Sequence, residues 1–168
     1  HEGTRAETIF VTGNTAIDAL QTTVREDYTH PELTWAEGSR LIVITAHRRE
    51  NLGEPMHHMF RAIRRIMDEH PDVKAIYPIH MNPVVRQAAD EELRGCDRIH
   101  IIEPMEVLDF HNLLARSYLI LTDSGGIQEE APSLGKPVLV MRDTTERPEG
   151  IDAGTLRLVG TDEDVIYR

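Results

Sequence analysis

The residues best suited to bind a ligand form the run Ser-Gly-Gly-Ile-Gln-Glu-Glu, which begins at Ser124, shortly after the apolar segment Tyr118–Leu121. Glycine lets backbone N–H groups approach a ligand closely, and the N-terminus of a helix attracts negative charge. Ser124, Gly125 and Gly126 therefore suit a phosphate or diphosphate, although their spacing is not that of a P-loop or a dinucleotide fingerprint. Glu130, further along the expected helix, could accept hydrogen bonds from a ribose diol. An ordinary helix start with Ser124 as its cap explains the same residues, and the residues alone leave both interpretations open.

A second charged cluster, His47-Arg48-Arg49-Glu50, follows the apolar run Leu41–Ile44. Its arginines could neutralise a diphosphate, and histidine is the side chain that exchanges a proton most readily near neutral pH. The alternative is a solvated loop whose arginine and glutamate side chains pair with one another. The position of the cluster directly after a strand favours the functional interpretation.

Three other features carry weaker signals. The segment Arg142–Glu149 also follows an apolar run, and an arginine there could bind sugar or phosphate oxygens, but taken alone it is typical of a charged loop. Asp123 could act as an acid or base, although capping of backbone N–H groups at the end of a strand fits its position better. We interpret His80 and His111 as packing or surface residues, and no spacing of metal-ligating side chains predicts a metal site.

The elements that must position these residues are visible as short apolar runs. Most of the runs are nearly continuous in β-branched residues and leucine, which is typical of parallel strands covered on both faces. We expect strands at Thr8–Val11, Leu41–Ile44, Lys74–Ile79, Arg98–Ile102, Tyr118–Leu121, Pro137–Val140 and Thr155–Val159.

Helical periodicity fills the segments between several of these runs. One apolar stripe repeats at helical spacing in a segment that ends near His70, and Asn82 with Pro83 provides the start of a second helix through about Leu93. A third helix is expected from about Glu106 to Ala115. The expected inner stripes are Met56, Met59, Phe60, Ile63 and Met67 in the first helix, and Val85, Ala88, Ala89 and Leu93 in the second.

Strand and helix thus alternate, which predicts an α/β fold with a doubly wound, mainly parallel sheet of the Rossmann-like type. No linker rich in Pro, Gly or Ser divides the chain, so we expect residues 1–168 to form a single domain, with Thr29–Arg40 as an exposed connection. Ligands of such sheets bind beyond the carboxyl ends of the strands. The two charged clusters and the Ser-Gly-Gly run all follow predicted strands, so the sequence predicts one site at that edge.

Composition narrows the class of protein. The chain has 168 residues with 18 Lys and Arg against 29 Asp and Glu, a formal charge of −11, which argues against nucleic acid as a partner. The single cysteine, Cys96, cannot form an internal disulfide, and no apolar run approaches the ~20 residues that span a bilayer. We therefore expect a cytoplasmic protein with no membrane association. Because it starts at His1 without an initiator Met, we expect a fragment of a longer chain.

Three motifs together resemble the bacterial non-hydrolysing UDP-N-acetylglucosamine 2-epimerases, in the same order and at similar intervals: His47–Asn51, Asp123–Glu130 and Arg142–Glu149. The resemblance runs from Val11 onward and corresponds to the second of the family's two Rossmann-like domains, one half of a GT-B arrangement. It implies interconversion of UDP-GlcNAc and UDP-ManNAc without a cofactor. UDP is eliminated to give a 2-acetamidoglucal and is then added back.

The same resemblance implies roles for individual residues. His47 matches the catalytic histidine, and Ser124, Gly125 and Gly126 match the phosphate-binding turn. The resemblance also marks four substrate-binding residues: Met105, through its backbone, and Phe110 near the uracil, Glu130 at the ribose, and Arg147. Arg48 and His47 match residues of an allosteric UDP-GlcNAc site.

The family's proton-transfer carboxylates lie in an N-terminal domain that these 168 residues do not include. We therefore expect this chain to fold and to bind UDP weakly, but not to epimerise. The full-length protein is expected to be a homodimer that serves the synthesis of cell-wall polysaccharide. Two alternatives are the donor-binding half of a GT-B glycosyltransferase and a non-catalytic module that binds a nucleotide sugar.

Overall fold

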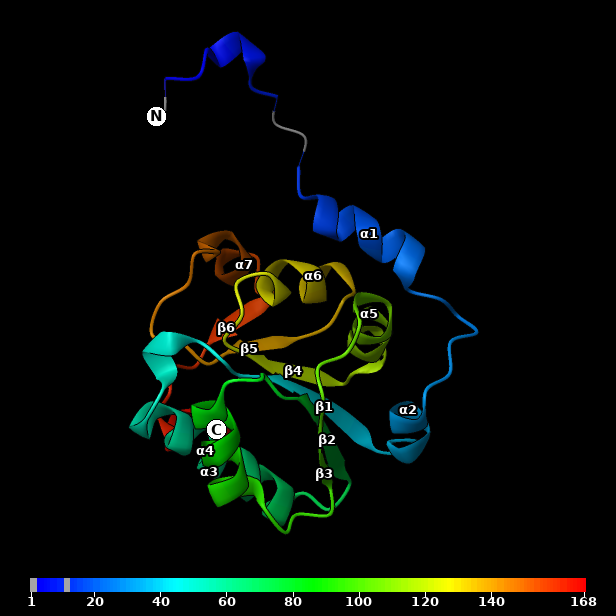
Figure 1. Cartoon of the computed structure of the whole chain (residues 1–168), viewed down its shortest axis with the longest axis vertical. Helices are drawn as coiled ribbons and strands as arrows, with labels where there is room; N and C mark the ends of the chain where they lie inside the picture. The colour runs from blue at the N-terminus through cyan, green and yellow to red at the C-terminus, as the bar shows by residue number, and fades with distance from the viewer. Residues whose placement is uncertain (1–2, 11–12) are drawn as a thin grey trace.

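The computed structural model describes residues 3–10 and 13–168. Its strands form one six-stranded sheet in the order β3-β2-β1-β4-β5-β6, with every neighbouring pair parallel (Figure 1). The order runs outward from the centre in both directions, as in a doubly wound, Rossmann-like sheet, so the predicted fold class is confirmed. The strands are β1 (Arg40–Thr45), β2 (Val73–Pro78), β3 (Ile99–Ile102), β4 (Leu119–Thr122), β5 (Val138–Val140) and β6 (Leu156–Leu158).

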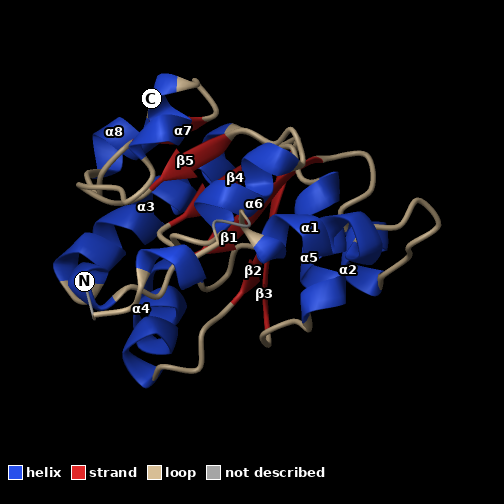
Figure 2. Cartoon of the chain, turned by 90° about the horizontal axis from the view of Figure 1, so that it is seen from above, coloured by secondary structure: helices blue, strands red, loops and turns tan. Residues whose placement is uncertain are grey.

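Helices cover both faces of this sheet (Figure 2). One face carries α3 (Glu54–Glu69), α4 (Pro83–Leu93) and α8 (Glu163–Tyr167). The other carries α5 (Val107–Arg116) and α6 (Ile127–Ser133), with α1 (Thr15–Thr23) packed across both helices. The remaining elements are α2 (Pro31–Trp35), α7 (Pro148–Asp152) and two 3₁₀ helices, η1 (Ala6–Thr8) and η2 (Arg49–Asn51). Within the described ranges, no helix has the length and apolar character needed to cross a membrane.

Strand β1 shows why the runs are continuous and not alternating. Leu41 and Val43 belong to the core beneath α5 and α6, whereas Ile42 and Ile44 belong to the core beneath α3 and α4. Successive side chains of a strand point to opposite faces, so a strand between two helical layers must be apolar at every position. The periodicity of the sequence therefore follows from the two-sided burial of the sheet.

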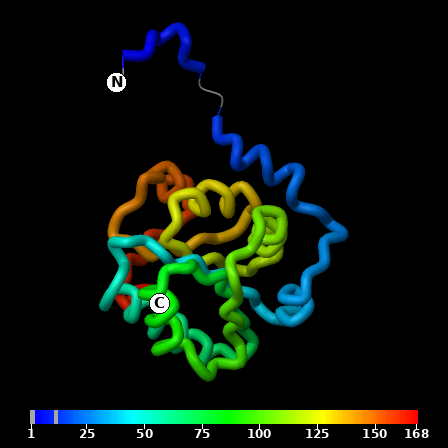
Figure 3. Tube along the Cα trace, in the orientation of Figure 1, coloured from blue at the N-terminus to red at the C-terminus, as the bar shows by residue number. Residues whose placement is uncertain are grey.

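The predicted helices α3 and α4 form with the predicted inner faces. The five side chains of the α3 stripe are fully buried, and the Asn82 side chain caps α4 by accepting a hydrogen bond from the backbone N–H of Val84 at 3.0 Å. All four residues of the α4 stripe are buried as well. The last helix, α8, packs against α3, which lies about a hundred residues earlier in the chain (Figure 3).

Two expectations for the first forty residues are wrong. Thr8 belongs to η1, and Ile9 and Phe10 are exposed and outside any strand. Among the described residues, no strand of the sheet pairs with this run, and Val11 lies outside them. The segment Thr29–Arg40 is not only a connection, since it contains α2. Helix α2 starts because the His30 ring accepts a hydrogen bond from the N–H of Glu32 and Pro31 occupies the first turn.

The carboxyl ends of β1 and β4 lie side by side at the centre of the sheet. Thr45 and Thr122 end these strands as register partners, and their buried hydroxyl groups are hydrogen-bonded at 2.5 Å. The chain winds away from this point toward β3 on one side and toward β6 on the other, which makes it the topological switch point of the sheet. Ligands of doubly wound sheets bind in the crevice at such a point.

We predict that the core beneath α3 dominates stability. Replacing Phe60, which is fully buried and packs against Tyr77 with ring centroids 5.7 Å apart, by alanine should lower the free energy of unfolding by about 3–5 kcal/mol. The matched control is Phe10→Ala, because Phe10 is 80% exposed and its loss should change that free energy by no more than ~0.5 kcal/mol. Urea unfolding followed by circular dichroism measures both, and equal losses would contradict the placement of this core.

Candidate functional site

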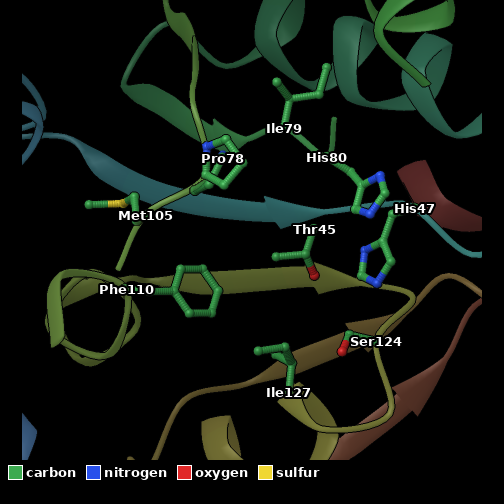
Figure 4. Close-up of a pocket in the computed structure, with 10 residues that line it drawn as sticks. Thr45, His47, Pro78, Ile79, His80, Met105, Phe110, Ser124 and Ile127 are labelled. Atoms are coloured by element: carbon green, nitrogen blue, oxygen red, sulfur yellow. The ribbon is translucent and has the colours of Figure 1, made fainter. Parts of the chain in front are cut away.

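A pocket of about 280 Å³ opens at the switch point (Figure 4). Every segment that lines it follows a strand, as expected for a ligand site of this fold. The lining residues are Thr45 at the end of β1 and His47 after it, Pro78 at the end of β2 with Ile79 and His80 after it, Pro104, Met105 and Phe110 after β3, and Ser124 and Ile127 after β4. The walls toward β2 and β3 are mainly apolar, and the polar groups gather at the ends of β1 and β4 (Figure 4).

The turn between β4 and α6 is held by two hydrogen bonds around Ser124. Its backbone N–H donates to Oγ1 of Thr122 at 2.9 Å, and its carbonyl accepts from the side chain of Gln128 at 3.2 Å. Helix α6 begins only at Ile127, with Gly126 in the cap position and no capping side chain. Ser124 is therefore not the helix cap that the alternative interpretation required, and its side chain lines the pocket instead.

Gly125 is where the turn meets the loop after β1. A Cβ atom at this position would lie 3.2 Å from Nη2 of Arg48 and 3.5 Å from Oε2 of Glu146. The absence of a side chain thus allows the Arg48 guanidinium to sit directly against the turn. This arrangement places a cation beside backbone N–H groups, a combination that favours an anionic ligand.

His47 stands at the mouth of the turn, between a carboxylate and a second imidazole. Its Nδ1 lies 3.6 Å from Oδ1 of Asp123, and its ring stacks on that of His80 with centroids 5.3 Å apart and 12° between the planes. Burial lowers the pKa of His47; the charge of Asp123 opposes this, and His80 and Arg48 add to the lowering. The ring is therefore neutral near neutral pH and able to accept a proton.

His80 was missed as a site residue. We interpreted it as a packing or surface residue, but it lines the pocket and stacks on His47. The signal was present in the sequence, because His80 follows β2 by two residues and the strand-end rule applies to it as it does to His47.

Asp123 organises the loop that carries His47. Its carboxylate is fully buried, and Oδ2 accepts hydrogen bonds from the backbone N–H groups of His47 at 2.9 Å and Arg48 at 2.8 Å and from the side chain of Asn51 at 3.2 Å. Arg48 Nε also donates to the Asp123 carbonyl at 3.2 Å. The predicted role of Asp123 in capping backbone N–H groups is confirmed.

Glu130 lies on α6, one turn past Ile127, and does not line the pocket. Its Oε2 is 3.6 Å from Nε2 of His111, a buried residue whose other ring nitrogen is hydrogen-bonded to Thr23 at 2.7 Å. Burial raises the pKa of Glu130; His111 counteracts the rise, and the charge of Glu129 adds to it. His111 is thus a packing residue, as expected, but one that also faces a candidate ligand group.

Arg147 also lies apart from the main pocket. Its Nε is paired with Glu129, and its Nη1 donates to the carbonyl of Glu146 at 3.0 Å. It lines a second hollow of about 420 Å³ between α1, α6 and α7, together with Ile17, Gln128 and Glu129 among others. Of the residues singled out from the sequence, His47, Met105, Phe110 and Ser124 therefore share one pocket. The others, which are Arg48, Gly125, Gly126, Glu130 and Arg147, are not among its lining residues.

Comparison with known proteins places the chain in a family. The sequence profile described as UDP-N-acetylglucosamine 2-epimerase matches residues 1–168. A Bacillus subtilis UDP-N-acetylglucosamine 2-epimerase is 65% identical over 167 residues, which are 99% of this chain and 44% of the relative. The chain therefore spans less than half the length of the curated relatives that it matches.

Solved structures agree with the sequence match. The structure of S. aureus MnaA with UDP superposes with a TM-score of 0.92 at 53% identity, covering 99% of this chain and 46% of that one. The UDP-GlcNAc 2-epimerase of Neisseria meningitidis, solved with UDP-GlcNAc, gives a TM-score of 0.87 at 44% identity, covering 99% of this chain and 47% of that one. The resemblance found in the sequence is thus confirmed, and this chain belongs to the UDP-N-acetylglucosamine 2-epimerase family.

Proposed function

We propose that this chain is the UDP-binding half of a non-hydrolysing UDP-GlcNAc 2-epimerase. In this proposal residues 1–168 are one Rossmann-like domain of a GT-B-type protein that interconverts UDP-GlcNAc and UDP-ManNAc. The observation that carries the proposal is the convergence of His47, Met105, Phe110 and Ser124 on one pocket at the switch point of the sheet. Family membership supports it, and two relatives solved with UDP or UDP-GlcNAc support the class of ligand.

The lining of the pocket suits the parts of UDP in order. Met105 and Phe110 offer an apolar surface and an aromatic face to the uracil. Gly125 and Gly126 offer backbone N–H groups to the diphosphate, and Ser124 offers its hydroxyl group, beside the guanidinium of Arg48. Glu130, one turn along α6, would accept the ribose hydroxyls, and Arg147 would bind the substrate from the far side of α6.

The proposed reaction balances without an external oxidant or reductant. A base removes the proton from carbon 2, the C–H electron pair becomes the C1–C2 double bond, and the C1–O bond breaks as its electron pair leaves with UDP. Return of a proton to the opposite face of carbon 2 and re-addition of UDP to carbon 1 complete the inversion. Arg48 lies where negative charge would grow on the departing diphosphate and would stabilise it, and His47 beside it would transfer a proton in the pocket.

Several further expectations belong to the full-length protein. We propose that it is a cytoplasmic homodimer in cell-wall polysaccharide synthesis, and that UDP-GlcNAc also acts as an effector through His47 and Arg48. Its proton-transfer carboxylates would come from the N-terminal domain. The net charge of −11 on this chain supports nucleotide-sugar ligands over nucleic acid, because binding of a phosphate backbone needs a net basic face.

We predict that UDP binds the chain through Phe110. Titration with UDP should shift the amide NMR signals of Ser124–Gly126 and Phe110, and Phe110→Ala should weaken binding about tenfold because stacking on the base is lost. Val107→Ala is the control, since Val107 lies on the same helix, is 61% exposed and does not line the pocket. Shifts confined to another surface, or equal affinities of the two variants, would place the uracil elsewhere.

We also predict that Glu130 makes binding of UDP depend on pH. Protonation removes the charge that accepts the ribose hydroxyls, and because the pKa of Glu130 is raised, this loss begins at a higher pH than for an ordinary glutamate. Affinity should fall when calorimetry is repeated from about pH 7.5 down to about pH 5. The control is Glu130→Gln, which should bind about tenfold more weakly at the higher pH and should retain only the dependence due to UDP itself. Parallel pH profiles of the two proteins would argue against a ribose contact.

A third prediction concerns the reaction. The full-length protein should exchange the carbon 2 proton of UDP-GlcNAc for deuterium in D₂O, and His47→Ala should slow this exchange at least about 100-fold. The isolated 168-residue chain should show none, because the proposed base lies outside it. Proton NMR of the substrate follows all three samples, and exchange catalysed by the isolated chain would contradict the division of roles.

A further inference from the structure

The two oxygens of the buried Asp123 carboxylate have different environments. Oδ2 accepts three hydrogen bonds, from His47 N, Arg48 N and Asn51 Nδ2. Oδ1 is equally buried, has no hydrogen-bond partner among the described residues, and lies 3.6 Å from Nδ1 of His47. A buried carboxylate oxygen without a donor is unfavourable, so this atom needs an explanation.

We propose that Asp123 is a positioning residue for His47, with Oδ1 holding the imidazole in the tautomer that carries its proton on Nδ1. Nε2 is then the atom that accepts and returns a proton in the pocket. This proposal rests on the proposed function, in which His47 faces the nucleotide sugar. It goes beyond capping of the loop, because the oxygen that faces His47 is Oδ1, which takes no part in the hydrogen bonds to the loop.

The geometry leaves the carboxylate little freedom. Its three donors on Oδ2 come from one loop and fix the plane of the Asp123 side chain, so Oδ1 points toward His47 in a defined direction. The His47 backbone is bound to the same carboxylate, which also fixes the start of the imidazole side chain. A small rotation of the ring would shorten 3.6 Å to an ordinary hydrogen bond, and catalytic hydrogen bonds are often this long before substrate binds.

The other neighbours of the His47 imidazole restrict its orientation and its pKa. His80 stacks on one face of the ring, 5.3 Å away between centroids, so a large rotation of the imidazole would break this contact. Burial, His80 and Arg48 all lower the pKa of His47, and the negative charge of Asp123 is the one influence that raises it. Asp123 therefore keeps His47 basic enough to accept a proton in a pocket that otherwise disfavours the imidazolium.

The variant Asp123→Asn distinguishes two roles of this side chain, positioning of His47 and hydrogen bonding to the loop after β1. Asparagine has the same shape, and its carbonyl oxygen can still accept the three N–H donors on the Oδ2 side. Its NH₂ group then occupies the Oδ1 position, where it donates to Nδ1 and drives the His47 proton to Nε2. The loop is retained, whereas the tautomer is reversed and the charge is lost.

The test measures tautomer, pKa and turnover. ¹⁵N NMR of the histidine side chains in the chain should show His47 protonated on Nδ1 in the wild type and on Nε2 in Asp123→Asn, with a lower pKa in the variant. In the full-length protein, kcat for epimerisation should fall about 100-fold or more while KM changes less than about threefold. Ser117→Ala is the control, because Ser117 is a buried polar residue at the opposite end of β4, bound to the Leu114 carbonyl at 2.7 Å, and all these readouts should stay unchanged.

Two results would overturn the proposal: a wild-type His47 that carries its proton on Nε2, or an Asp123→Asn variant with unaltered tautomer, pKa and kcat. If the variant does not fold, the wild-type tautomer still decides the question. Failure of the proposed function looks different, because the wild-type full-length protein would then leave the carbon 2 proton of UDP-GlcNAc unexchanged. The NMR measurements on His47 would remain decisive in that case.

Discussion

The structure of the site depends on one buried charge, the carboxylate of Asp123. It sits at the end of β4 and binds the backbone of the loop that follows β1, so it joins the two halves of the sheet at the point where the winding reverses. An ionised group in this place is costly unless donors surround it, and the loop supplies them with the N–H groups of His47 and Arg48. The loop therefore has one low-energy arrangement, which brings His47 to the pocket and Arg48 to the Gly125 turn.

An ion cluster around the buried Arg142 fixes the neighbouring loop. Arg142, a residue that is 5% exposed, is bound through its guanidinium to the exposed carboxylates of Glu50 at 2.6 Å and Glu146 at 2.7 Å. These partners belong to the loops after β1 and β5, so Arg142 connects two of the motifs that the sequence singled out. Buried ion pairs contribute little net stability, but they set geometry strictly because a broken pair leaves a charge unpaired. Arg142 thus holds the loops in place, and Arg48 is the arginine that lies against the Gly125 turn.

The strands and the buried faces of helices could be predicted from the periodicity of the sequence. Features that depend on which segments become neighbours in three dimensions could not. Continuous apolar runs identify β1 to β6, and the stripes of α3 and α4 identify their buried faces, because two-sided burial leaves a direct trace in the order of residues. The run at Thr8–Phe10 has the same composition but no adjacent strand to pair with, and composition alone does not reveal that. Likewise, the stacking of His80 on His47 depends on β2 lying beside β1, and the pairing of Arg147 with Glu129 depends on the path of the loop after β5.

The chemistry of the pocket limits which part of the proposed reaction it could serve. Its lining contains two imidazoles, hydroxyl groups and apolar side chains, and no carboxylate is among its lining residues. With the Arg48 guanidinium beside the Gly125 turn, such a surface suits a nucleotide and its departing diphosphate, which need donors, a cation and an aromatic face. It is a poor place for the base that removes a weakly acidic proton from carbon 2, because the pKa of His47 is lowered here and the stacked His80 opposes charge on the ring. In the proposed epimerase, the base that acts at carbon 2 is therefore assigned to residues other than those that line this pocket.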